Sequence, residues 1–154
     1  PAFFKDIPEQ WKVRMSDLQA VVAMEQLKNL DYHNRKRREN AQILNTILRG
    51  SNGIAVPISI PEVEHIYLYY VLLVKKKTRL DDIRSLLISR RVDTQLNELT
   101  TSKELEVFGA NSMDYPIFNR VSSNLLILPN GIYLDRNDIS FVGNTVKTIL
   151  DSIV

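Results

Sequence analysis

A helical pattern of apolar residues from Ser16 to Leu48 constrains the fold of this chain most. Ser16 and Gln19 have the spacing of a capping box, in which the serine hydroxyl accepts a hydrogen bond from the Gln19 amide and the Gln19 side chain accepts one from the Ser16 amide. Asp17 adds a negative charge at the positive end of the helix dipole. We therefore expect a helix to begin at Ser16. Polar residues 31–34 interrupt the apolar stripe, so one bent helix and two helices are both possible.

Short apolar runs and further helical patterns fill the rest of the chain. Gly50 is placed to end the first helical region in the left-handed conformation. Residues Gly53–Pro61 combine alternating apolar positions with prolines, which predicts an edge strand or an extended connection because proline cannot donate to a ladder. The apolar run Ile66–Val74 predicts a central strand buried on both faces. The other expected elements are helices starting at Thr78, over Pro116–Ser123 and over Asp135–Val154, strands over Val92–Leu96 and Leu125–Leu128, and a long loop over Asn97–Asp114.

This order of elements predicts an α+β fold, a two-layer sandwich in which a small, mainly antiparallel or mixed sheet packs against helices. The chain has 154 residues, which fits one domain by the usual size of about 100–200 residues. It has no cysteine, so it has neither a disulfide framework nor thiolate chemistry, which fits the cytosol. The run Ile66–Val74 is the longest apolar stretch and is too short for a transmembrane helix. We expect a cytoplasmic protein without a membrane partner.

The charged residues favour no nucleic-acid partner and no familiar catalytic site. There are 20 Lys and Arg against 18 Asp and Glu, for a net charge of +2, which leaves no dominant basic surface. The basic run Arg35–Arg38, on which a nucleic-acid-binding reading would depend, points around a helix rather than along one face. With only His33 and His65 available, the sequence predicts no metal site, no catalytic triad and no catalytic residue.

Several segments, taken in order, resemble the pyridoxal-phosphate-dependent sugar aminotransferases of the DegT/DnrJ/StrS family. Arg14–Ala20 has the Arg-Met-Ser-x-x-Gln-Ala pattern that opens the C-terminal domain in that family. His65–Tyr69 is similar to its His-x-Tyr strand, and Leu126–Pro129 to its late Leu-Pro pattern. The remaining matches are Gln26-Leu27, Arg37–Ala41, Asp81-Asp82 with Leu86-Leu87, Tyr115-Pro116 and Asp138-Ile139. Each match alone is weak, but together they cover nearly the whole chain.

The resemblance implies that residues 14–154 are the C-terminal, small domain of a sugar-nucleotide aminotransferase and that residues 1–13 are a linker or lead-in at the domain border. The parent enzyme transfers an amino group, with glutamate as the expected donor, to a keto-sugar. Its partners are then an N-terminal large domain, a second subunit of a homodimer and a nucleotide-sugar. The family's catalytic lysine lies in a Ser-Phe-x-x-x-Lys segment, and no lysine here has that context. The first residue is Pro1 rather than Met, which either removal of an initiator methionine or a fragment explains. We expect a fragment, because the resemblance begins at a domain border. Without the catalytic lysine, we expect it to bind no coenzyme and to have no activity alone.

The resemblance also implies four site residues. Lys12 stands where the family has an asparagine that contacts the cofactor phosphate of the neighbouring subunit, and Arg14 lies beside it. His65 and Tyr67 fall near the substrate cleft. Residues 94–97 replace the family's His-Tyr-Pro segment, which puts a ligand contact there in doubt. The alternatives are that Lys12 and Arg14 are solvated, that His65 and Tyr67 only pack, and that the chain is a non-catalytic interaction or ligand-binding module.

Overall fold

The computed structural model describes residues 14–75, 80–96, 115–122 and 124–152. The chain divides into two compact units, Pro1–His33 and Asn34–Val154. Within the described residues, no helix combines the length and the apolar character that crossing a membrane requires.

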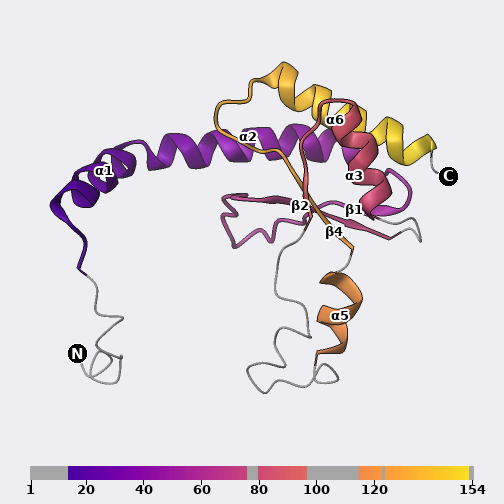
Figure 1. Ribbon diagram of the computed structural model, residues 1–154, viewed down its shortest axis with the longest axis horizontal. Helices are drawn as coiled ribbons and strands as arrows, with labels where there is room; N and C mark the ends of the chain where they lie inside the picture. Colours follow the sequence, from indigo (N-terminus) through magenta and orange to yellow (C-terminus); the bar gives the residue numbers. More distant parts are fainter. Residues whose placement is uncertain (1–13, 76–79, 97–114, 123, 153–154) are drawn as a thin grey trace. The chain divides into compact units, whose positions relative to one another are not determined.

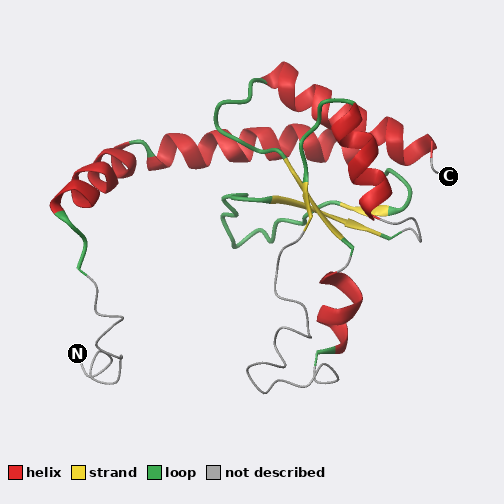
Figure 2. Cartoon of the chain, in the orientation of Figure 1, coloured by secondary structure: helices red, strands yellow, loops and turns green. Residues whose placement is uncertain are grey.

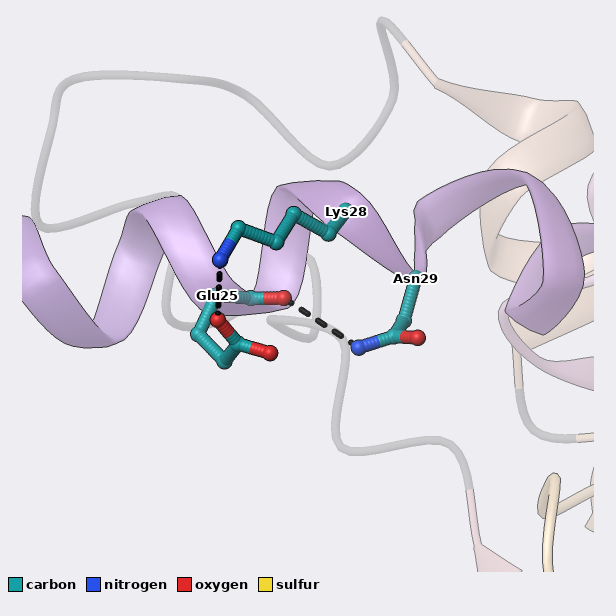
Figure 3. A network of polar contacts seen from close by, with 3 residues as sticks. All are labelled: Glu25, Lys28 and Asn29. Carbon is teal, nitrogen blue, oxygen red and sulfur yellow. Dashed lines mark hydrogen bonds and ion pairs between the residues drawn. The ribbon is translucent and has the colours of Figure 1, made fainter.

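The first unit contains helix α1, Asp17–Lys28, and the expected capping box begins it. The Ser16 amide donates to Gln19 Oε1 at 2.9 Å and the Gln19 amide donates to Ser16 Oγ at 3.4 Å. At the other end, Lys28 Nζ lies 2.6 Å from Glu25 Oε2, and Asn29 Nδ2 donates to the Glu25 carbonyl oxygen at 3.2 Å (Figure 3). Asn29 therefore caps α1, and the chain forms two helices rather than one bent helix, with the break two residues before the polar segment 31–34.

Helix α2, Leu30–Leu48, begins directly after this cap and continues into the second unit. It stops where predicted, since Gly50 has a φ of 83° and takes up the left-handed conformation.

The second unit contains a four-stranded antiparallel sheet with the order β1-β2-β4-β3. Its strands are β1 (Ile54–Ala55), β2 (Tyr70–Val74), β3 (Gln95–Leu96) and β4 (Leu125–Leu128). In the central pair, Tyr70 lies opposite Leu128 and Leu72 opposite Leu126. The edge position of β1 and the stop of β4 before Pro129 are confirmed. The two outer strands are shorter than expected, since β1 covers only two residues of Gly53–Pro61 and β3 only two of Val92–Leu96.

The prediction of a strand over Ile66–Val74, buried on both faces, is wrong in two respects. β2 begins only at Tyr70, and along it buried residues alternate with half-buried ones. The reason for the late start is Tyr67, whose φ of 49° turns the chain before the strand. The alternation follows from the two-layer fold, because helices bury only one face of an antiparallel sheet.

Helices α3 (Leu80–Ser89), α6 (Arg136–Ser152) and the second-unit part of α2 lie on one side of the sheet, and α5 (Pro116–Ser122) lies on the other (Figures 1 and 2). The core between the sheet and the three helices is apolar. Its largest fully buried side chains include Leu44, Leu48, Tyr70, Leu72, Ile83, Leu87, Leu126, Leu128, Ile139 and Ile149. The predicted α+β sandwich of two layers is confirmed. The expected helix start at Thr78 and the expected loop Asn97–Asp114 lie outside the described residues.

Candidate functional site

A strained turn at Tyr67 brings together two of the predicted site residues. Tyr67 is buried and has a φ of 49°, which is rare for a residue with a side chain and costs about 1–3 kcal/mol. Its amide donates to His65 Nδ1 at 2.9 Å, and the centroids of the two rings lie 4.3 Å apart. Such a conformation persists only where its surroundings enforce it. His65 therefore acts here as a local brace on the backbone.

The second brace is Asn130, which the sequence reasoning missed. Its Nδ2 donates to the Tyr67 carbonyl oxygen at 2.7 Å, and its side chain is buried. The next carbonyl, that of Gly131, accepts from Asn40 Nδ2 at 3.1 Å. The segment after β4 is thus tied both to the turn and to α2. In the sequence, only the turn-forming pair Asn130 and Gly131 directly after Pro129 indicates a special role for this segment. The pair does not indicate which residue Asn130 contacts.

Beside this turn, Tyr70 begins β2 with a buried phenol. Its hydroxyl donates to Asn45 Oδ1 at 2.8 Å, and its ring stacks on that of Tyr67 with centroids 6.4 Å apart. Burial raises the pKa of Tyr70 well above that of a free tyrosine, and the neighbouring Tyr67 raises it further. The phenol is therefore a neutral hydrogen-bond donor that links the sheet to α2, and it is not a candidate base.

A pocket of about 310 Å³ opens next to the turn, and we call it the Arg37 pocket. Its polar lining comes from α2, the segment that leads into β3, and the segment after β4. Side chains directly before β2 and on β4 form most of the rest. The lining residues are Arg37, Leu68, Tyr69, Asp93, Gln95, Ile127, Leu128, Pro129, Asn130 and Gly131. A cation, a carboxylate and an amide, those of Arg37, Asp93 and Gln95, line one hollow, which is an arrangement suited to a polar ligand.

The other predicted site residues do not join this pocket. Lys12 lies outside the described residues, and Arg14 is exposed and belongs to the first unit. Their expected contact with a cofactor phosphate therefore stays a prediction. His65 is exposed and, like Tyr67, is absent from the pocket lining. Their connection to the pocket is indirect, because the next residues, Leu68 and Tyr69, line it, and so does Asn130, which is bonded to Tyr67.

The lining of the Arg37 pocket does not form a covalent site for pyridoxal phosphate. Such a site needs a lysine amine for the coenzyme carbonyl and several donors for its phosphate. The described lysines are Lys28, Lys36, Lys75 and Lys147, and none of them lines the Arg37 pocket. Within the same residues, no three histidine, aspartate or glutamate side chains gather to hold a metal ion.

Replacing Asn130 by alanine is expected to lower the free energy of unfolding by about 2 kcal/mol, because it leaves the buried Tyr67 carbonyl without its donor. The control is Asn124→Ala, since Asn124 Nδ2 also donates to a carbonyl, that of Arg120 at 3.0 Å, but at an exposed position. This control should cost less than about 1 kcal/mol. Urea unfolding of the variants measures both values. Equal losses in the two variants would show that Asn130 does not brace the turn.

Tyr70 predicts a loss of stability at alkaline pH. Its pKa is raised in the folded chain, so its contribution is fully present below the pKa of an unfolded tyrosine, about 10, and is lost as the pH rises above that value. Tyr70→Phe has no phenol at this position, so ionisation of residue 70 cannot lower its free energy of unfolding at high pH. The difference in free energy of unfolding between the wild type and Tyr70→Phe, measured in urea at pH 8 to 11, should shrink above about pH 10. A constant difference would contradict a buried, neutral phenol.

Comparisons with known proteins agree with this architecture. The aminotransferase TlmJ of Streptoalloteichus hindustanus matches with a TM-score of 0.75 and 23% identity, over 90% of this chain and 37% of that protein. The sugar aminotransferase CalS13 of Micromonospora echinospora matches with a TM-score of 0.77 and 20% identity, over 90% of this chain and 36% of that protein. Spr1654 of Streptococcus pneumoniae, solved in a PLP form, matches with a TM-score of 0.78 and 18% identity, over 92% of this chain and 37% of that protein.

These TM-scores establish a shared fold, and the chain spans little more than a third of the length of each of these structures. No curated protein sequence matches it significantly. The sequence pattern of one family, however, matches residues 8–147, which is most of the chain. The protein therefore belongs to the DegT/DnrJ/EryC1/StrS aminotransferase family.

Proposed function

We propose that this chain is the C-terminal, small domain of a pyridoxal-phosphate-dependent sugar-nucleotide aminotransferase, with residues 14–154 as the domain and residues 1–13 as its lead-in. The parent enzyme transfers an amino group from an amino acid, with glutamate as the expected donor, to a keto-sugar. The observation that carries the proposal is the family match over residues 8–147 together with a fold shared with solved aminotransferases.

In this proposal the covalent chemistry depends on a lysine outside the chain. No lysine of the sequence follows the family's Ser-Phe-x-x-x pattern, and no described lysine lines the Arg37 pocket. A transaminase needs a lysine amine to hold its coenzyme and to move protons. The chain therefore contributes one wall of the substrate cleft, and the large domain contributes the reacting groups.

The four residues singled out in the sequence take supporting roles in this proposal. His65 fixes the turn at Tyr67, and this turn shapes the entrance to the substrate cleft. Lys12 and Arg14 contact the phosphate of the coenzyme in a second subunit, which makes the parent enzyme a homodimer. Lysine does so as a point charge, without the directed pair of contacts that an amide offers.

The test is a turnover assay of the purified 154-residue chain with added pyridoxal phosphate, glutamate and a panel of nucleotide-linked keto-sugars. We expect the rate of 2-oxoglutarate formation to equal that of the coenzyme without protein. Saturable turnover that disappears when a single lysine is replaced would contradict the proposal. Replacement of the exposed Lys147 by methionine serves as the reference for non-specific loss.

The second candidate is a non-catalytic ligand-binding module derived from the same family. The Arg37 pocket favours it, because all of its lining residues belong to the second unit of this chain. The two candidates differ in their response to the rest of the enzyme. A domain of an enzyme gains turnover when the large domain and coenzyme are supplied, whereas a binding module does not.

A further inference from the structure

We propose that the Arg37 pocket binds a sugar phosphate, with Arg37 contacting the phosphate and Asp93 and Gln95 contacting the sugar hydroxyls. The inference deepens the proposed function and rests on it for the kind of ligand. The position of the site rests only on the geometry of the second unit.

Arg37 is the feature that selects an anion. Its neighbour Arg38 is satisfied by an ion pair with Glu64, in which Nη1 and Oε1 lie 2.7 Å apart. The half-buried Arg37 has neither a hydrogen bond nor an ion pair to any residue in the described ranges. A guanidinium that is partly removed from water and faces a hollow favours an anion with paired oxygens, because it donates two parallel hydrogen bonds to a phosphate or carboxylate.

Asp93 and Gln95 select a ligand that also carries hydroxyl groups. Both line the same pocket, and the chain between them is held where the Thr94 carbonyl oxygen accepts from Arg84 Nε at 3.3 Å. The Asp93 carboxylate accepts hydrogen bonds but repels a bare anion. A phosphate joined to a polyol satisfies both ends of the pocket, since its charge meets Arg37 and its hydroxyls donate to Asp93 and Gln95.

The size and the remaining lining of the pocket agree with one sugar ring. About 310 Å³ is at the small end of the roughly 300–1,000 Å³ found for ligand pockets. Leu68 and Ile127 offer apolar surface, and Tyr69 offers an exposed ring. These side chains suit the C–H face of a sugar.

Two of the lining residues, Asn130 and Gly131, form what we call the floor of the pocket. Asn130 and Gly131 are tied to Tyr67 and Asn40 by the two hydrogen bonds described above. The Oδ1 atom of Asn130 is buried and has no hydrogen-bond partner in the described part of the chain. A floor held in advance lowers the entropy cost of binding.

The experiment is a calorimetric titration of the 154-residue chain with three probes: glucose 1-phosphate, glucose and inorganic phosphate. We expect glucose 1-phosphate to bind more tightly than either of its parts. In Arg37→Met, which keeps the apolar stem, its affinity should fall by about tenfold or more, because a charge-assisted pair is lost. Asp93→Asn should weaken binding of glucose 1-phosphate, because its hydroxyls lose a charged acceptor, and should strengthen binding of inorganic phosphate, because the repelling carboxylate is gone.

Two controls keep the test decisive. Arg90→Met removes an exposed arginine outside the pocket and should leave the affinity unchanged. Arg37→Lys keeps the charge without the paired donors and should lose part of the affinity. Thermal unfolding of each variant shows whether it is folded. Asp93 is exposed, so Asp93→Asn still tests the site if Arg37→Met does not fold.

Three results would overturn the inference: no binding of glucose 1-phosphate, equal binding of inorganic phosphate, or an equal loss in Arg90→Met. Failure of the proposed function is a separate result. The turnover assay detects that failure as transamination by the chain alone, and its result depends on a lysine and not on Arg37. If the chain binds glucose 1-phosphate and also catalyses transamination alone, the pocket assignment stands. The proposal that the chain lacks its own catalytic lysine is then wrong.

Discussion

Shortening Leu72 to alanine is expected to lower the free energy of unfolding by about 3 kcal/mol, within the 2–5 kcal/mol typical of buried leucines. Leu72 lies in the central strand β2, is 0% exposed and pairs with Leu126 of β4. The alanine leaves a cavity between sheet and helices that a closely packed core cannot fill. For a chain of this length, each kcal/mol lowers the melting temperature by roughly 2–4 °C, so we expect a drop of about 6–12 °C.

The control for this prediction is Ile58→Ala, because Ile58 is 87% exposed. It should change the free energy of unfolding by less than about 0.5 kcal/mol. Urea unfolding followed by circular dichroism measures both variants. Similar losses at the two positions would contradict a core between the sheet and the helix layer.

Replacing Gly143 by valine is expected to cost about 2 kcal/mol, within the usual range for overpacking. Gly143 is buried in α6, and a Cβ built there would lie 2.9 Å from Ile47 Cδ1, 3.2 Å from Cγ2 and 3.3 Å from Cβ. The Cδ1 atom can rotate away, but Cγ2 of Ile47 moves only if the restricted χ1 rotamer of this β-branched residue changes, and Cβ moves only with the backbone of α2. Gly143→Ala gains about 1 kcal/mol in helix propensity, which offsets part of its clash, whereas valine adds two further methyl groups.

A double-mutant cycle tests whether this contact is the cause. Ile47→Ala alone removes apolar surface and destabilises the chain, but in the Gly143→Val background it also relieves the clash. We therefore expect the double variant to be at least about 1 kcal/mol more stable than the sum of the two single effects predicts. Additive losses would mean that α2 and α6 do not approach closely at this point.

Local rules predicted most of the secondary structure. The capping box at Ser16, the left-handed Gly50, the proline-led α5 and the end of β4 before Pro129 each depend on residues within one turn of each other. The break between α1 and α2 was left open, because a single Asn29 cap decides it. The start of β2 was predicted too early, because apolar content cannot reveal that Tyr67 adopts a positive φ.

The site was harder to predict than the fold, because most of its contacts join distant parts of the chain. His65 and Tyr67 are two residues apart, so their hydrogen bond follows from a local pattern. Asn130 reaches Tyr67 across 63 positions, and only the pairing of Tyr70 with Leu128 brings them together. The basic run 35–38 was correctly read as lacking one common face, but nothing in it singled out Arg37 as the residue that lines a pocket.

The central claim is that this chain has the fold of its family without the lysine that forms the covalent bond to the coenzyme. Its most direct test is to incubate the chain with pyridoxal phosphate, reduce the mixture with borohydride and locate any modified lysine by mass spectrometry. We expect weak labelling spread over exposed lysines, with no lysine modified in a one-to-one ratio. One lysine modified completely, at a coenzyme concentration equal to that of the chain, would contradict the claim.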